Sequence, residues 1–402
     1  MKYEFEDFYQ DYFIFQRLGR GKYYTESYPD AIKNNRLKPK QLIKDFLNLF
    51  ESILYNKSKT RPCILIWETK FKEIIEDHVK FYNFIVVTNS LKKYKQVSKI
   101  KGIKVYFAHH WYDLIDKGFE THNMKYTKEA VDKIKKYIKK NNIRVVILGN
   151  DKMFIERAIK AAAEEINVPV VIIQHGIYNI DSFKQLQTAD SARHFWVWSE
   201  YIKDIYLKYT GKQDTDIKVI GYPFRLDIVP VKNKRKVLFL GNQYLNYNKK
   251  EGDGYFKIAE TVYDICKKNN LEFVYRPHPS EKITSKYNIF KEKISKNSSL
   301  MFDLKETWVV VGDISSTMVE AALVGRPVVQ VIWSPRSEIG VTDPMYGFTK
   351  KTINDKSHIE KTILNCVESE YVNSLNKYYI MRNDNLKNDI KKYIDELINE
   401  KC

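Results

Sequence analysis

The stretch RVVILGNDKMFIERAIKAAAEEINVPVVIIQHG, residues 144–176, carries a strand, a helix and a second strand in direct succession. The apolar runs at 144–149 and 169–174 have the length and β-branched content of buried strands. Residues 151–166 between them repeat apolar side chains at helical spacing. Because strands joined by such a crossover run parallel, the stretch predicts a parallel sheet covered by helices on both faces.

The same alternation extends in both directions along the chain. We expect further strands at 63–67, 84–88, 103–108, 195–198, 237–241, 272–276, 308–312 and 327–332, and helices at 31–57, 127–140, 254–269 and 357–401. A segment punctuated by glycine and proline, 220–236, separates two series of strands. The 402 residues therefore predict an α/β protein with two doubly wound, Rossmann-like domains, 1–225 and 226–375. We expect residues 376–402 to form a helix that packs back on the first domain.

His175 ends the strand at 169–174, and Gly176 follows it. Doubly wound sheets bind ligands at the carboxyl ends of their strands, and two such domains place the site in the cleft between them. A histidine there suits a general base, because its pKa lies near neutrality, and the glycine leaves room for a substrate. The alternative is a structural histidine with a satisfied side chain.

The segment YRPHPSEK (275–282) follows another predicted strand. Pro277 and Pro279 bracket His278 and hold this loop in a rigid, extended path. Arg276 and His278 together predict a cationic pair that binds the phosphate of a donor. The alternative is a proline-rich turn with a surface histidine.

The segment GDISSTMVEAALVGRPVVQ (312–330) opens a helix directly after a strand. Ser315, Ser316 and Thr317 bring hydroxyl groups to the helix N-terminus, where free N–H groups favour an anion, so we expect phosphate contact there. Glu320 could bind ribose hydroxyls, or it could close a capping box with Thr317. Asn242, in FLGNQ (239–243), occupies a first βα loop and is expected to approach the nucleotide.

A third cluster, AHHWYD (108–113), follows a strand of the first domain. His109, His110 and Asp113 are candidate acceptor contacts. They are also metal-ligand types, but no further ligand cluster supports a metal site, and we expect none.

The composition indicates a basic, reducing-compartment protein. Lys and Arg number 68 against 50 acidic residues, a net charge of +18, which favours an anionic partner unless the lysines only solvate helix faces. The four cysteines form no CxxC pair, the first residues lack signal-peptide features, and no apolar run approaches the roughly 20 residues of a membrane helix. These features predict a cytoplasmic protein.

The order of QHG, KVIGYP (218–223), YRPHP and DISSTMVEAALVGRPVV resembles bacterial surface-polysaccharide (capsule) glycosyltransferases of the GT-B type. In its His-Gly, HP and Ser-Ser elements it is also similar to teichoic acid glycerophosphotransferases. The resemblance covers about residues 144–332. It implies metal-independent transfer, with His175 as base, His278 on the donor phosphate, and Ser315 and Ser316 on phosphate or nucleotide. The run from Glu320 to Val328 looks more like sugar-nucleotide enzymes, in which the acid binds ribose.

The expected function is therefore an inverting glycosyltransferase with no cofactor beyond its nucleotide-sugar donor, UDP- or CMP-linked. It would extend a glycan or lipid-linked glycan at the inner face of the cytoplasmic membrane, with basic surface on anionic lipid. One alternative is a CDP-polyol polyolphosphotransferase that uses the same residues. A sugar-nucleotide epimerase should carry more acids in the cleft, and a nucleic-acid-binding protein should show clustered arginine rather than dispersed lysine.

Overall fold

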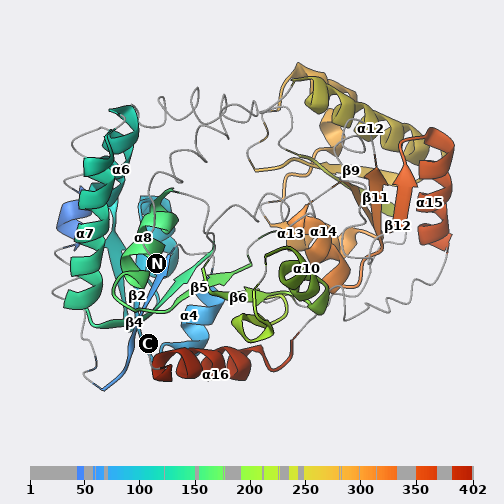
Figure 1. Ribbon diagram of the computed structural model, residues 1–402. Coiled ribbons are helices and arrows are strands. Elements are labelled where there is room, and N and C mark those ends of the chain that lie inside the picture. Colours follow the sequence, from blue (N-terminus) through green and yellow to red (C-terminus); the bar gives the residue numbers. More distant parts are fainter. Residues whose placement is uncertain are drawn as a thin grey trace.

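A computed structural model gives the fold (Figure 1). It describes residues 43–48, 58, 60–67, 71–121, 123–149, 154–174, 176, 192–210, 212–224, 226, 235–242, 249–279, 281, 283–297, 299–313, 315–332, 350–368 and 383–400. These residues build two parallel sheets covered by helices, which lie side by side in Figure 1.

The first sheet has seven strands in the order β3-β2-β1-β4-β5-β6-β7. Its strands are β1 (Cys63–Trp67), β2 (Asn83–Thr88), β3 (Ile103–Phe107), β4 (Ile143–Leu148), β5 (Val170–Ile173), β6 (His194–Val197) and β7 (Ile217–Val219). Its helices are α4 (Lys72–His78), α5 (Leu91–Val97), α6 (His109–Glu120), α7 (Met124–Lys140), α8 (Phe154–Glu164) and α10 (Glu200–Thr210). Every residue of β1, β2 and β5 is buried, as expected for strands with helices on both faces.

The second sheet has five strands in the order β12-β11-β10-β8-β9. They are β8 (Lys236–Leu240), β9 (Glu272–Arg276), β10 (Val309–Gly312), β11 (Val328–Ile332) and β12 (Lys350–Ile353). The helices around it are α12 (Lys249–Lys268), α13 (Leu300–Glu306), α14 (Ser316–Leu323), α15 (Lys356–Glu368) and the 3₁₀ segment η3 (Ser285–Lys293).

The last helix, α16 (Leu386–Asn399), returns to the first sheet and packs against α4 and β4 (Figure 1). Ile390, Ile394 and Leu397 are buried in the core cluster beneath that sheet. Polar contacts add to this packing, since the Tyr82 hydroxyl donates to Asp395 Oδ1 at 2.6 Å. The C-terminal helix therefore ties the chain end to the first half of the molecule.

A single hydrophobic cluster contains residues of both sheets. Trp198 and Tyr222 of the first half belong to the same cluster as Leu240, Val310 and Met318 of the second. Burying apolar surface between the halves stabilises one arrangement of the two sheets, at about 25 cal/mol per Å² of surface removed from water.

The predicted fold class is confirmed, and each predicted strand is present. The two short outermost strands β7 and β12 were not predicted, and residues 109–113, which follow β3, begin α6. Of the predicted helix at 31–57 only 43–48 is described, and that part is helical. No described helix has an apolar stretch long enough to cross a bilayer.

Candidate functional site

The second sheet reverses its strand order at β8, which lies between β10 and β9. The loops that follow these three strands leave the same carboxyl edge, where doubly wound sheets bind ligands. Asn242 follows β8, His278 follows β9 and Ser315 follows β10. The topology thus brings the predicted donor residues to one edge.

A half-buried carboxylate positions the loop that carries His278. Glu281 accepts hydrogen bonds from the His278 backbone N–H at 2.9 Å, from the Tyr275 hydroxyl at 2.6 Å, and from the Tyr287 hydroxyl. Burial raises the pKa of Glu281, while the three donors oppose that rise. Glu281 lies within the YRPHPSEK segment, and the sequence alone predicts no role for it.

Gly241 is required by the same arrangement. A Cβ at this position would lie 2.2 Å from Glu281 Oε2, 2.8 Å from the Tyr275 hydroxyl and 2.9 Å from the Arg276 carbonyl oxygen. The Gly241 N–H donates to that carbonyl at 2.7 Å. The backbone after β8 therefore approaches the His278 loop more closely than any side chain allows.

The expectation of a free cationic pair on this loop needs correction. The Arg276 guanidinium forms an ion pair with Asp303, a residue only 5% exposed, and donates to the Asn297 carbonyl at 3.3 Å. Burial lowers the pKa of His278, so its imidazole is neutral at neutral pH. His278 would therefore offer a phosphate a hydrogen bond rather than a charge. That either residue binds the donor stays a prediction.

The N-terminus of α14 is capped by Ser315, whose Oγ accepts a hydrogen bond from the Thr317 N–H at 3.2 Å. Because the helix begins at Ser316, the alternative capping box between Thr317 and Glu320 is wrong. Ser316 and Thr317 lie in the first turn, where helix N–H groups lack partners within the helix. The Ser315 hydroxyl still has a proton to donate.

Glu320 instead contacts the first half of the chain. Its Oε1 accepts a hydrogen bond from the Tyr222 hydroxyl at 2.7 Å. Burial raises the pKa of Glu320, whereas the positive charge of Arg276 lowers it. Tyr222 lies in IGYP, just beyond β7, after Gly221, which has a positive φ of 78°. The contact joins α14 to the carboxyl edge of the first sheet.

His175 lies outside the described residues, but its neighbours are held firmly. Gln174 is 1% exposed, and its Oε1 accepts a hydrogen bond from the Trp198 N–H at 2.8 Å. Its Nε2 donates to the Gly176 carbonyl at 3.0 Å, and Trp198 Nε1 donates to the Gln174 carbonyl at 2.8 Å. Gln174 thus joins the end of β5 to Gly176 and to Trp198, which follows β6. The sequence signal for the role of Gln174 was a polar residue directly after a wholly apolar strand.

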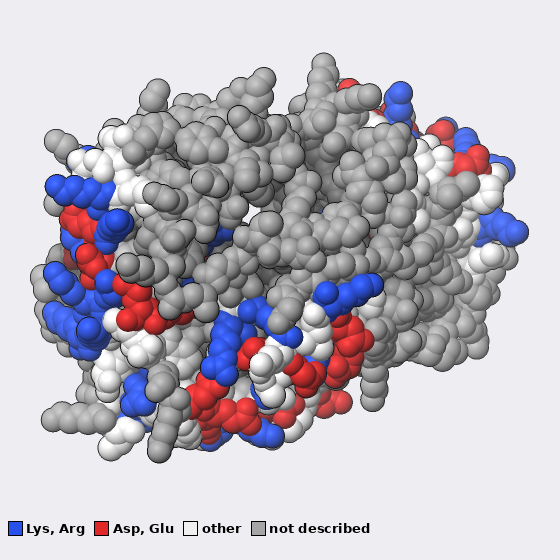
Figure 2. Space-filling view, in the orientation of Figure 1, with Lys and Arg blue, Asp and Glu red and all other residues white. Residues whose placement is uncertain are grey.

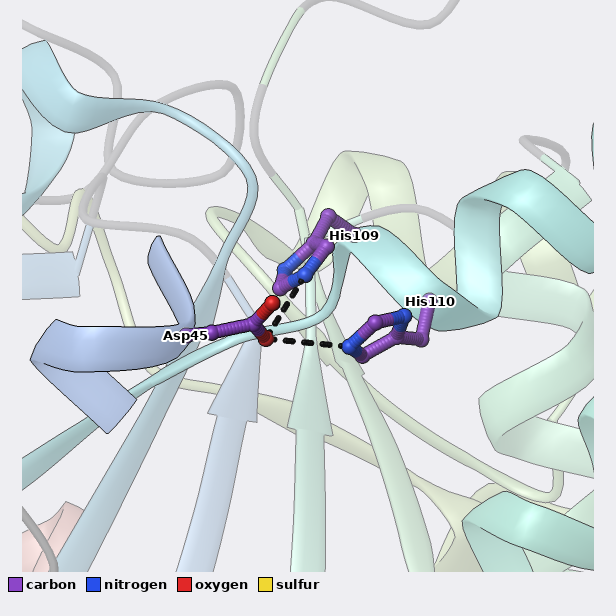
Figure 3. Close-up of side chains that lie close together, drawn as sticks. All are labelled: Asp45, His109 and His110. Atoms are coloured by element: carbon purple, nitrogen blue, oxygen red, sulfur yellow. Dashed lines mark hydrogen bonds and ion pairs between the residues drawn. The ribbon is translucent and has the colours of Figure 1, made fainter. Parts of the chain in front are cut away.

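The predicted acceptor residues divide between surface and interior. The His109 side chain is 3% exposed, whereas that of His110 is 56% exposed, so the His109 ring is not presented to a soluble acceptor. Asp45, from the helix at 43–48, lies within 3.1 Å of both imidazoles (Figure 3). Asp113 is not part of this three-residue group. The sequence analysis missed Asp45 because it precedes the histidines by more than sixty residues.

No protein-family model and no curated protein sequence matches the chain. Solved structures resemble it. A glycosyltransferase from Rickettsia africae aligns with a TM-score of 0.53 and 12% identity, over 85% of this chain and all of its own. The UDP-GlcNAc 2-epimerase of Neisseria meningitidis, bound to UDP-GlcNAc, gives a TM-score of 0.57 and 12% identity, covering 83% of this chain and 100% of its own. The wall teichoic acid polymerase TagF aligns with a TM-score of 0.51 and 10% identity, over 94% of this chain and 97% of its own.

The fold is that of the GT-B enzymes. At such low identities the likeness concerns the fold, so the assignment of an activity depends on the residues at the two sheet edges.

Proposed function

We propose that the chain is a metal-independent, inverting glycosyltransferase that uses a nucleotide-activated sugar to build a capsule or other bacterial surface polysaccharide. The observation that carries the proposal is the convergence of Asn242, His278 and Ser315 at one edge of the second sheet. Across from it, the Tyr222–Glu320 hydrogen bond links that edge to the first sheet. A GT-B-like fold supports this reading, because such sheets bind ligands at the edge concerned.

On the donor side, the diphosphate would lie at the N-terminus of α14. The hydroxyls of Ser315, Ser316 and Thr317, together with the positive end of the helix dipole, would stabilise the charge that develops on the leaving nucleotide. The neutral imidazole of His278 would donate a further hydrogen bond. Since Arg276 is paired with Asp303, its charge would act at longer range.

Glu320 would hold the ribose. One carboxylate oxygen is bonded to Tyr222, and the other can accept a hydrogen bond from a ribose hydroxyl. Nucleotide binding would then be coupled to the position of the first sheet, where the acceptor lies.

On the acceptor side, His175 would act as the general base. It would take the proton of an acceptor hydroxyl as the oxygen bonds to the anomeric carbon of the sugar. The bond from that carbon to the donor phosphate breaks, and the nucleotide leaves on the opposite face, which inverts the configuration. Gln174 would fix the imidazole by bonding to the backbone beside it. The acceptor would be a glycan or lipid-linked glycan, and His110 and Asp113 are its proposed contacts.

We place the enzyme at the inner face of the cytoplasmic membrane. Helix α7, MKYTKEAVDKIKKYIKK, holds seven lysines against two acidic residues, and Figure 2 shows basic side chains gathered, with acidic ones among them, where α7 lies in Figure 1. Over α16 both signs are interspersed, and Lys391 pairs with Asp395. The α7 surface is thus the described region best suited to anionic headgroups, each lysine contributing about 1 kcal/mol.

A second candidate is transfer of a polyol phosphate from a CDP-polyol. TagF supports it, since that structure aligns over 94% of this chain against 83–85% for the other two. The same donor residues would then stabilise CMP as leaving group. The two reactions differ in their product, because a phosphodiester contains phosphorus and a glycosidic bond does not.

The deciding experiment is a thermal-shift screen with UDP, CMP, CDP and GDP, followed by product analysis with the matching donor. A nucleotide at a hundred times its Kd should stabilise the protein by about 2.7 kcal/mol. Glu320→Gln serves as the test variant, and His358→Gln, on the exposed start of α15, as its control. Absence of any nucleotide-induced shift would contradict the proposal, as would conversion of the donor to an epimer without acceptor.

A further inference from the structure

Three metal-ligand side chains from two separate segments converge in the first half of the molecule. Asp45 lies on the helix at 43–48, and His109 and His110 open α6 at the carboxyl end of β3. Asp45 Oδ1 lies 3.1 Å from His109 Nε2 and 3.0 Å from His110 Nε2 (Figure 3). The potential ligand atoms of all three residues lie within 4.8 Å of one another.

These spacings fit a coordination shell. A tetrahedral Zn²⁺ with bonds of about 2.0–2.1 Å separates its ligand atoms by about 3.3 Å. The two oxygen–nitrogen distances differ from that edge length by a few tenths of an ångström, which side-chain rotation can supply. Two imidazoles and one carboxylate are also a donor set that zinc commonly takes, with a water in the fourth position.

His109 supplies an independent reason to expect a ligand. The residue is 2% exposed, yet neither of its ring nitrogens makes a hydrogen bond within the described part of the chain. Its approach to Asp45 is therefore close without being a hydrogen bond. A buried polar group left unsatisfied costs about 1–3 kcal/mol, and a metal bond to Nε2 would remove the part of that cost that falls on this nitrogen.

The electrostatics of the site also favour a cation. The nearest competing cation, Lys44, donates its ammonium to Asn89 Oδ1 at 2.8 Å. Asp45 and Asp113 each contribute a negative charge that acts on His109.

The helix that carries Asp45 is docked independently of any ion. The Asn48 side chain accepts a hydrogen bond from the Phe107 N–H at 2.7 Å and donates to the Phe107 carbonyl at 3.1 Å. Because β3 is the edge strand of the sheet, Asn48 occupies backbone groups that would otherwise lack a partner strand. Asp45 is thereby held one helical turn away, facing the histidines.

We propose that His109, His110 and Asp45 bind a Zn²⁺ ion, with a water as fourth ligand, and that the ion fastens the helix at 43–48 to the first turn of α6. The ion would stabilise the fold and would orient His110, one of the proposed acceptor contacts. It lies apart from the donor site, so it is compatible with metal-independent transfer.

The test measures Zn²⁺ binding to the full chain after treatment with a chelator, by competition with a chromophoric zinc indicator. We expect one tight site per chain and a higher melting temperature with zinc. His110→Ala and Asp45→Ala, at half-exposed positions that should not disturb folding, should each weaken the site at least about tenfold. His358→Ala is the matched control, because His358 pairs with Asp355 at 2.8 Å and the two belong to no group of three ligand residues among those the structure describes.

Cobalt provides a second readout. Co²⁺ in the same site should give the visible absorption of a tetrahedral ion with nitrogen and oxygen ligands, and this absorption should vanish in both test variants. Wild-type zinc affinity in His110→Ala and Asp45→Ala would overturn the proposal. Equal weakening by His358→Ala would also overturn it, because binding would then reflect dispersed surface histidines.

Discussion

Gly241→Ala tests whether the close approach of β8 to the His278 loop holds the donor edge together. The added methyl would sit 2.2 Å from Glu281 Oε2, 2.8 Å from the Tyr275 hydroxyl and 2.9 Å from the Arg276 carbonyl. All three distances are too short for a carbon atom, so either the backbone shifts or the Glu281 carboxylate leaves its place.

The two outcomes differ in cost. Backbone shifts that relieve overpacking cost about 1–3 kcal/mol. Displacing Glu281 breaks hydrogen bonds to a charged acceptor, worth about 1.5–3 kcal/mol each. The structural change with the lower cost, the backbone shift, will occur, so we expect the free energy of unfolding to fall by about 2 kcal/mol. For a domain of this size that corresponds to a melting temperature about 4–8 °C lower.

The assay is thermal and urea unfolding of Gly241→Ala beside wild type. Gly176→Ala is the matched control, since no described atom lies within 4 Å of its added methyl, and its stability should stay within about 0.5 kcal/mol. A double-mutant cycle with Glu281→Ala isolates the contact. Once the carboxylate is gone, Gly241→Ala should cost less than in the wild type. Wild-type stability in Gly241→Ala, or strictly additive effects in the cycle, would refute the reasoning.

The remaining predictions concern activity and pH. His175→Ala should bind nucleotide almost normally, but its kcat should fall by a factor of about 10²–10⁴. The decrease of the wild-type rate at acid pH should be absent from the variant. Near-normal turnover would show that another residue is the base. His278→Ala should weaken nucleotide binding by about 1.5–3 kcal/mol, measured by calorimetry, and an unchanged affinity would remove His278 from the site. Turnover should survive EDTA, and a loss that Mg²⁺ or Mn²⁺ restores would point to catalytic acids not yet identified. Burial lowers the pKa of His278, so the unfolded state binds a proton at this residue more readily than the folded state does. The free energy of unfolding should therefore fall as the pH drops below about 6.5, and His278→Gln should reduce this fall in urea titrations. The same dependence of unfolding free energy on pH in wild type and His278→Gln would show that burial of His278 is not its cause.

The two sheets could be predicted from the sequence because their signal is local. Strands buried on both faces must be apolar throughout, and the helices between them must be apolar on one side, so each element carries its own pattern. The strands missed were the exceptions to this rule. β7 has only three residues, and β12 reads KKTI, so neither carries an apolar run of the usual strand length. The carboxyl-end rule then selected His278, Ser315 and Asn242 from the sequence alone.

The contacts within the site were decided only by the tertiary structure, because they depend on burial and on distant partners. Glu320 contacts Tyr222 across 98 residues, and Asp45 contacts His110 across 65, separations at which no periodicity carries information. The sequence predicted Arg276 to be a cation available to a phosphate. In the fold it forms an ion pair with Asp303, which lies on α13. The pKa of His278 is lowered because the packed loop removes water from its ring, and this desolvation exists only in the folded chain.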